Sequence, residues 1–120
     1  MNLRLELFVS NVEEVKQFYI SIFDFEIVKE TNDYLSLEKD SVTLGIGNIN
    51  KLESTHPLKG DTRGKGIEIV LEVEDIYKTY NDIRSKEYPI NTPLQNRDWG
   101  LTDFRLKDPE GYYIRVTSKE

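Results

Sequence analysis

Few side chains in this protein are suited to covalent chemistry. The 120 residues include no cysteine and a single histidine, His56. The lack of cysteine excludes disulfides, thiolate zinc sites and cysteine nucleophiles, and one imidazole excludes a mechanism that needs two. Ser54 lies close to His56, but no G-x-S-x-G elbow surrounds it. We therefore expect no catalytic residue, and any chemistry must depend on carboxylates, guanidinium groups and aromatic rings.

Charged and aromatic residues alternate with aliphatic ones in three short segments, as in strands with one buried face. The aliphatic sets are Leu3, Leu5, Leu7 and Val9; Ile67, Ile69, Leu71 and Val73; and Ile114 and Val116. The opposite faces carry Arg4, Glu6 and Phe8; Glu68, Val70 and Glu72; and Tyr113 and Arg115. A face that mixes charges with aromatic rings suits a partly hydrated, concave surface, so these faces are the candidate binding surface.

Trp99, the only tryptophan, follows the turn-rich segment 95–98 and precedes Gly100. This setting places the indole near the mouth of a cleft, where it would stack on a flat or cationic ligand. A packing role in the core is the alternative.

The elements that must position these side chains occur twice along the chain. Val9 and Val73, 64 residues apart, each end a strand that leads into a helix capped by Asn11 or Asp75. Three short strands are expected after each helix, at 25–29, 33–38 and 41–47, and at 88–92, 101–107 and 111–117. The modules are expected at about 1–48 and at 66–120, with a linker at 49–65.

These modules predict a single α+β domain, residues 1–120, in which two paired βαβββ modules form a cupped mixed sheet with a cleft. Neither module could bury its own sheet face alone. The predicted core includes Leu5, Leu7, Val15, Tyr19, Ile69, Leu71, Ile83, Ile114 and Val116.

Composition excludes two classes of partner. There are 16 basic and 22 acidic residues, a net charge of −6, which is unfavourable for contact with nucleic-acid phosphates. No apolar run approaches the ~20 residues that a membrane-spanning helix needs. Residues 1–6 lack the apolar stretch of a secretion signal, so we expect a cytoplasmic protein.

Two stretches resemble the vicinal oxygen chelate superfamily, which includes glyoxalase I, extradiol dioxygenases, fosfomycin-resistance enzymes and bleomycin-resistance proteins. Within residues 9–25, V-S-N-V and F-Y-I-S-I-F-D-F are similar to the family's V-x-D and F-Y-x-x-x-L-G-F. Within residues 108–114, D-P-E-G-Y-Y-I is similar to its D-P-D-G-x-x-I. Asp24 stands where the family usually has glycine, and aspartate tolerates the left-handed conformation. The resemblance implies the paired βαβββ fold.

The resemblance also implies a place for the metal ligands of the family's enzymes. Their inward strand positions fall on Arg4, Glu68 and Arg115, and near Leu44. Only Glu68 could bind a divalent cation, because a guanidinium has no lone pair to donate. We therefore expect no metal and no other cofactor, with Arg4, Glu68 and Arg115 converging as ion pairs instead. Simple charge compensation at the sheet surface is the alternative for these three residues.

These residues are compatible with three alternative functions. The first is a metal-free protein similar to the bleomycin-resistance branch, which binds a small molecule and sequesters a drug or metabolite. The residues expected to contact this ligand are Arg4, Glu6, Phe8, Leu44, Glu68, Glu72, Trp99, Arg105, Tyr113 and Arg115. The acidic surplus favours a cationic ligand, whereas the arginines favour an anionic group on it. The sign of the ligand's charge therefore stays open.

The second function is a metal-dependent lyase, isomerase or dioxygenase of the same family with displaced ligands, such as Glu6, Glu72 and His56. The third is a protein that acts through assembly alone. A metal analysis separates the first two.

The resemblance further implies a homodimer with a two-fold interface, because small cupped sheets leave an edge and an apolar rim exposed. Light scattering at tens of micromolar should give about 28 kDa, twice the 14.1 kDa of one chain. The mass of a single chain under those conditions would contradict the dimer.

Overall fold

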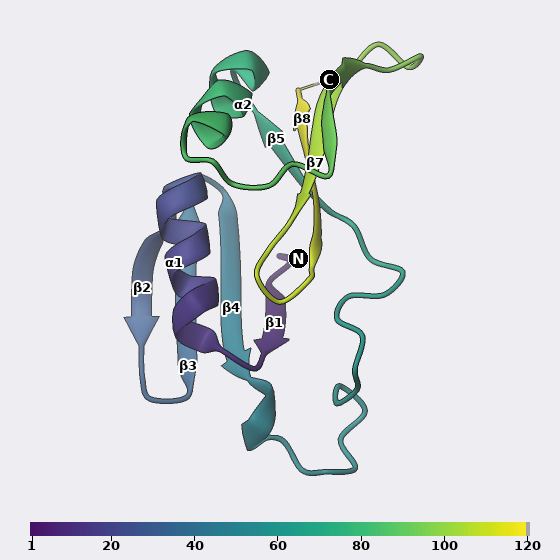
Figure 1. Cartoon of the computed structure of the whole chain (residues 1–120). Helices are drawn as coiled ribbons and strands as arrows, with labels where there is room; N and C mark the ends of the chain where they lie inside the picture. Colours follow the sequence, from purple (N-terminus) through teal and green to yellow (C-terminus); the bar gives the residue numbers. More distant parts are fainter. Residues whose placement is uncertain (120) are drawn as a thin grey trace. The chain divides into compact units, whose positions relative to one another are not determined.

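In the computed structural model, which describes residues 1–119, the chain folds as two units with the same β-α-β-β-β order. The units are Met1–Asp61 and Thr62–Glu120, so their boundary lies within the expected linker. Each unit has one four-stranded sheet and an α-helix, which confirms the predicted fold class (Figure 1). The assignment of residues 1–120 to one domain stays a prediction.

The first unit combines a parallel strand pair with an antiparallel hairpin. Its elements are β1 (Leu5–Val9), α1 (Val12–Phe23), β2 (Glu26–Glu30), β3 (Tyr34–Lys39), β4 (Val42–Asn48) and the 3-10 helix η1 (Ile49–Lys51). The strand order is β1-β4-β3-β2, with β1 parallel to β4 and β3 antiparallel to both neighbours. The three strands expected after the helix are confirmed, each beginning one residue later than predicted.

Both ends of α1 are formed by the residues that the sequence predicts there, Asn11 as the N-cap and Asp24 at the C-terminal end. Asn11 accepts a hydrogen bond from the Glu14 backbone N–H at 3.0 Å, and its Nδ2 donates to Glu14 Oε2 at 3.4 Å. This reciprocal pair satisfies an otherwise unbonded amide at the helix start. Asp24 ends the helix at φ 60°, the left-handed conformation expected there. The apolar side of α1 is buried through Val15, Phe18, Tyr19 and Ile22.

The second unit repeats this arrangement. Its elements are β5 (Ile69–Val73), α2 (Ile76–Ser85), β6 (Thr92–Asn96), β7 (Thr102–Lys107) and β8 (Tyr113–Ser118), in the sheet order β5-β8-β7-β6. Strand β5 is parallel to β8, and the other pairs are antiparallel. The expected cap of α2 is present, because Asp75 accepts a hydrogen bond from the Lys78 backbone N–H at 3.1 Å.

The prediction of a strand at residues 88–92 is wrong, because β6 (Thr92–Asn96) begins only at Thr92. Residues 88–91 connect α2 to the sheet, and the Tyr88 hydroxyl donates to the Lys107 carbonyl at 2.5 Å. Pro89 has no N–H to offer a strand partner. Pro93 is tolerated because β6 is the edge strand and its pairing is irregular between Thr92 and Gln95.

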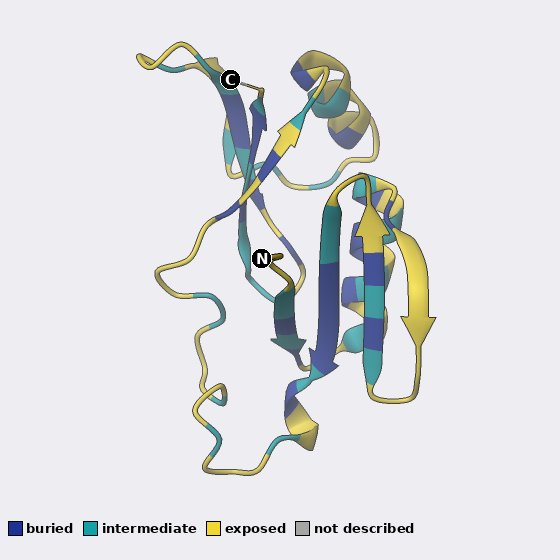
Figure 2. Cartoon of the chain, turned by 180° about the vertical axis from the view of Figure 1, so that it is seen from behind, coloured by how far each residue is buried: buried dark blue, intermediate teal, exposed yellow. Residues whose placement is uncertain are grey.

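The predicted register of β5 is confirmed. Ile69 and Leu71 are buried, whereas Val70 between them is 41% exposed. The other predicted core residues are also buried except Leu5, which is half-buried at the start of β1. Figure 2 shows the contrast between the mostly buried β4 and the fully exposed edge strand β2.

No helix among residues 1–119 is long and apolar enough to cross a membrane.

Replacing Leu71 by alanine should lower the free energy of unfolding by about 2–5 kcal/mol, because the side chain is buried and leaves a cavity. Val70→Ala, on the adjacent residue of the same strand, should cost well under about 1 kcal/mol because Val70 faces solvent. Urea unfolding followed by circular dichroism measures both. Equal losses in the two variants would contradict this register.

Candidate functional site

One face of the second sheet carries charged side chains, and the opposite face is apolar. Along β7, Phe104 and Leu106 are buried with Ile114 and Val116 of β8. Asp103 and Arg105 point to the other face, together with Arg115, which pairs across the strands with Arg105. Arg97, just after β6, and Glu68, just before β5, add their charges to this face. We call Glu68, Arg97, Asp103, Arg105 and Arg115 the arginine cluster.

Asp103 is the buried centre of the arginine cluster. Its side chain is 0% exposed, although a carboxylate is rarely buried without compensating charges. Its Oδ1 lies 2.8 Å from Arg97 Nε and 3.6 Å from Arg105 Nη1, and its Oδ2 lies 3.8 Å from Arg115 Nη1. Three guanidinium groups therefore surround one carboxylate.

Glu68 bridges two of these arginines from the edge of the cluster. Its Oε2 lies 3.2 Å from Arg105 Nε and its Oε1 lies 3.0 Å from Arg115 Nε. The expected pairing of Glu68 with Arg115 is confirmed, and the carboxylate also engages Arg105. Glu68 is the more accessible carboxylate, because about a third of its side chain is exposed.

Hydrogen bonding within the arginine cluster is incomplete. Arg97 Nη2, Arg115 Nε and Asp103 Oδ2 are buried and make no hydrogen bond in the structure. Arg115 Nε is close to Glu68, but its N–H is not aligned for a hydrogen bond. The cluster thus combines three positive groups, two negative groups and buried donors that lack acceptors.

The turn between β6 and β7 positions Arg97. The Arg97 backbone N–H donates to the Leu101 carbonyl at 2.8 Å, and the Gly100 N–H donates to the Arg97 carbonyl at 3.0 Å. Gly100 has φ 91°, which glycine adopts most readily. Trp99 lies in this turn and is 59% exposed, so its alternative role as a core residue is wrong.

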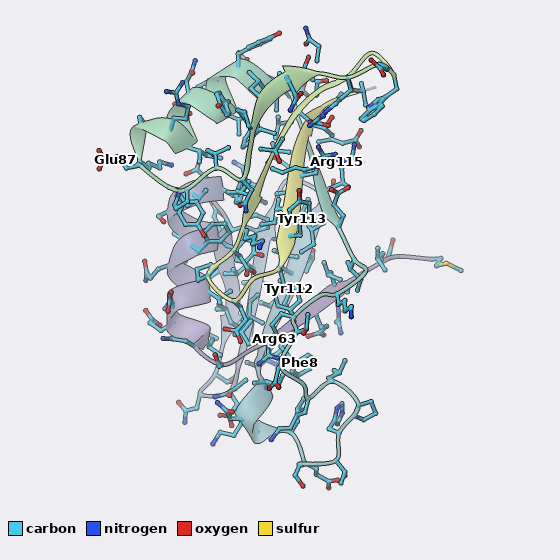
Figure 3. The ribbon with its side chains drawn as sticks, turned by 45° about the vertical axis from the view of Figure 1, so that its right-hand side comes forward. Phe8, Arg63, Glu87, Tyr112, Tyr113 and Arg115 are labelled. Carbon is cyan, nitrogen blue, oxygen red and sulfur yellow. The ribbon has the colours of Figure 1, made fainter. Side chains whose placement is uncertain are left out.

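Tyr113 and Glu72 share the charged face with Arg115, as the sequence predicts. Tyr113 lies two residues before Arg115 on β8, and Figure 3 shows both along this strand. Glu72 pairs with Thr117, the next residue on the same face. Tyr113 is half-buried and Glu72 is exposed.

In the first unit, Glu6 and Phe8 lie over two glycines of β4. A Cβ at Gly45 would collide with Glu6 Oε2, and one at Gly47 would come within 2.8 Å of the Phe8 ring. The Tyr34 hydroxyl donates to Glu6 Oε1 at 3.4 Å. Burial, reinforced by the charge of Glu6, raises the pKa of the Tyr34 phenol. Because Gly45 and Gly47 have no side chains, the Glu6 carboxylate and the Phe8 ring fit against β4.

Leu44 was expected among the ligand contacts, near an inward-facing strand position, and the structure turns its side chain the other way. Leu44 pairs with Leu5 and Leu37, so it faces the core, where it is buried, and Gly45 is the residue opposite Glu6. Arg4 pairs with Glu6 at 3.1 Å within the first unit, and its convergence with Glu68 stays a prediction.

Sequence reasoning missed Asp103 and the role of Arg97. The signal for Asp103 was present, because T-D-F-R-L-K at 102–107 alternates polar and apolar residues and puts Asp103 on the face of Arg105. No sequence pattern marked Arg97, because a hairpin turn brings it to Asp103.

A model of the Glyoxalase/Bleomycin resistance protein/Dioxygenase superfamily matches residues 3–116. The chain belongs to this superfamily. Among curated proteins there is no significant sequence match.

Solved structures with the same fold include TioX from Micromonospora sp. ML1, with TM-score 0.81, 17% identity and 98% of both chains covered. A lactoylglutathione lyase from Agrobacterium tumefaciens has TM-score 0.76 and 13% identity, covering 98% of this chain and 92% of that one. A glyoxalase/bleomycin resistance protein/dioxygenase from Nocardioides has TM-score 0.82 and 15% identity, covering 98% and 82%. At these identities the likeness shows the fold alone.

The residues expected at the superfamily's metal positions do not fit a divalent cation. Arg4 and Arg115 have no lone pair to donate, and both oxygens of Glu68 lie against guanidinium nitrogens. Across residues 1–119, no group of three or more His, Cys, Asp or Glu side chains is placed to hold a metal ion.

Replacing Asp103 by asparagine should lower the free energy of unfolding by about 3 kcal/mol, because the buried guanidinium groups lose their central counter-charge. Asp98→Asn is the matched control, since Asp98 is exposed in the neighbouring turn. Chemical unfolding at neutral pH measures both. A D103N variant as stable as D98N would show that the buried charge contributes nothing.

Proposed function

We propose that this protein is a metal-free, small-molecule-binding member of its superfamily that sequesters a drug or metabolite. The observation that carries the proposal is Glu68, whose two carboxylate oxygens are both occupied by arginine side chains. The residue expected at a metal position thus lies in ion pairs with arginine, and the surrounding face offers groups suited to ligand recognition.

The charged face of the second sheet supplies the groups that would contact the ligand. Guanidinium forks recognise planar anionic groups, and Tyr113 and the exposed Trp99 offer ring faces for stacking. The ligand-binding residues proposed in this unit are Glu68, Glu72, Trp99, Arg105, Tyr113 and Arg115, and we add Arg97, which joins Arg105 and Arg115 around the buried Asp103. In the first unit, the proposed contacts are Arg4, Glu6 and Phe8.

The metal-dependent alternative would need donors from elsewhere in the chain. Of its proposed ligands, His56 accepts a hydrogen bond at Nδ1 from the Leu58 backbone N–H at 3.1 Å, and Glu6 is engaged by Arg4 and Tyr34. These contacts favour the binding protein over the enzyme.

Protein purified without chelator should contain no stoichiometric Zn, Ni, Mn or Fe, because an entering cation would be desolvated beside guanidinium groups. Elemental analysis of the protein and calorimetric titration with each ion measure this. Glyoxalase activity should be absent with or without added metal. One divalent ion bound per chain at micromolar affinity would contradict the metal-free proposal.

Ligand binding itself is tested by a thermal-shift screen of drugs and metabolites, because a ligand that binds only the folded state raises Tm. The single Trp99 provides a second readout by fluorescence. A screen without any stabilising compound would count against the binding function.

A further inference from the structure

We propose that the arginine cluster is a site for an oxyanion, a carboxylate or phosphate group of the ligand, and that Glu68 occupies it as an internal substitute until the ligand displaces it. This inference rests on the proposed binding function and specifies the chemistry of its ligand. The sign of the ligand's charge, which composition leaves open, is then set locally by three arginines on one sheet face.

The position of Glu68 is that of a bound carboxylate. Its two oxygens are divided between Arg105 and Arg115, whose strands are neighbours in the sheet. Pairs of arginine with a carboxylate or phosphate are charge-assisted, and arginine is common where such anions are recognised. Glu68 itself lies before β5, so its side chain reaches the cluster from outside the sheet.

Glu68 nevertheless fills the site imperfectly. Arg115 Nε is buried and lies 3.0 Å from Glu68 Oε1 without a hydrogen bond. Buried donors without partners are costly. A ligand oxyanion, free to orient itself, can align with such donors in a way that a tethered glutamate does not.

The exchange of Glu68 for a ligand preserves the charge balance. Asp103 remains at the centre and holds Arg97, Arg105 and Arg115 in place. A singly charged ligand group that replaces Glu68 leaves three guanidinium groups facing two negative groups, as before. Asp103 is therefore a positioning residue, and Glu68 is the exchangeable one.

The segment before Glu68 is held against the connection between β7 and β8, and the displacement that we propose is a rotation of the Glu68 side chain. Arg63 Nε donates to Glu110 Oε1 at 3.0 Å, and both side chains are largely buried. Gly64 has φ 64°, and a Cβ there would come within 2.7 Å of the Tyr112 ring. Glu68 is only part-buried, so solvent can receive its carboxylate.

The test compares wild type, Glu68→Gln and Glu87→Gln by calorimetric titration with inorganic phosphate and with citrate at constant ionic strength. Glu87→Gln changes the net charge equally, but Glu87 is exposed just after α2 and apart from Arg115 (Figure 3). We expect Glu68→Gln to bind at least one of the two anions about tenfold more tightly than wild type. Glu87→Gln should match wild type.

A second readout locates the anion. The Nε–H resonances of Arg105 and Arg115 should shift on titration in Glu68→Gln, and Arg115→Gln in that background should remove the gain in affinity. Tm measurements verify that each variant is folded. A stronger response to phosphate identifies a phosphate ligand, and a stronger response to citrate identifies a carboxylate.

Glu68→Gln that gains no more affinity than Glu87→Gln, or that shows no shift at either arginine, overturns the oxyanion site. Failure here is separable from failure of the binding function. A compound from the thermal-shift screen that still binds would preserve the function and discard only the oxyanion chemistry. Anion binding to the protein when the screen yields no stabilising compound would preserve the oxyanion site and discard the proposed binding of a drug or metabolite.

Discussion

The burial of one carboxylate, Asp103, constrains the charged face of the second sheet. An isolated charge in that position would be strongly unfavourable, so the strands around it must supply positive groups. Arg105 comes from the same strand, Arg115 from the neighbouring one and Arg97 from the adjoining turn. Asp103 lies within ion-pair distance of all three arginines, so their guanidinium groups are arranged around this one side chain.

The two units use the same framework to build different surfaces. Gly45 in the first unit and Arg115 in the second occupy equivalent positions in their sheets. Each directly follows a core residue, Leu44 or Ile114, that pairs with the first strand of its unit. The first unit therefore has space where the second has a guanidinium, and Glu6 occupies that space over Gly45. The βαβββ framework sets the strands, and a few side chains set the chemistry of each face.

Local physical rules account for most of what could be predicted. The caps at Asn11 and Asp75, the left-handed Asp24 and the buried side of β5 all follow from short-range stereochemistry or from period-two alternation. Predictions failed where pairing decided the outcome. The strand expected at 88–92 begins later, and Leu44 faces the core because its register with Leu5 and Leu37 puts it there.

By itself the sequence determined the two modules, their strand and helix order and the likeness to the superfamily. Those features depend on residue type and on spacing along the chain. Only the tertiary structure decided that Asp103 is buried, that Arg97 reaches it from a turn, and that Glu68 bridges both Arg105 and Arg115. Such contacts join residues up to 47 positions apart, from Glu68 to Arg115, and the pairing of the strands that carry or adjoin these residues brings them within bonding distance.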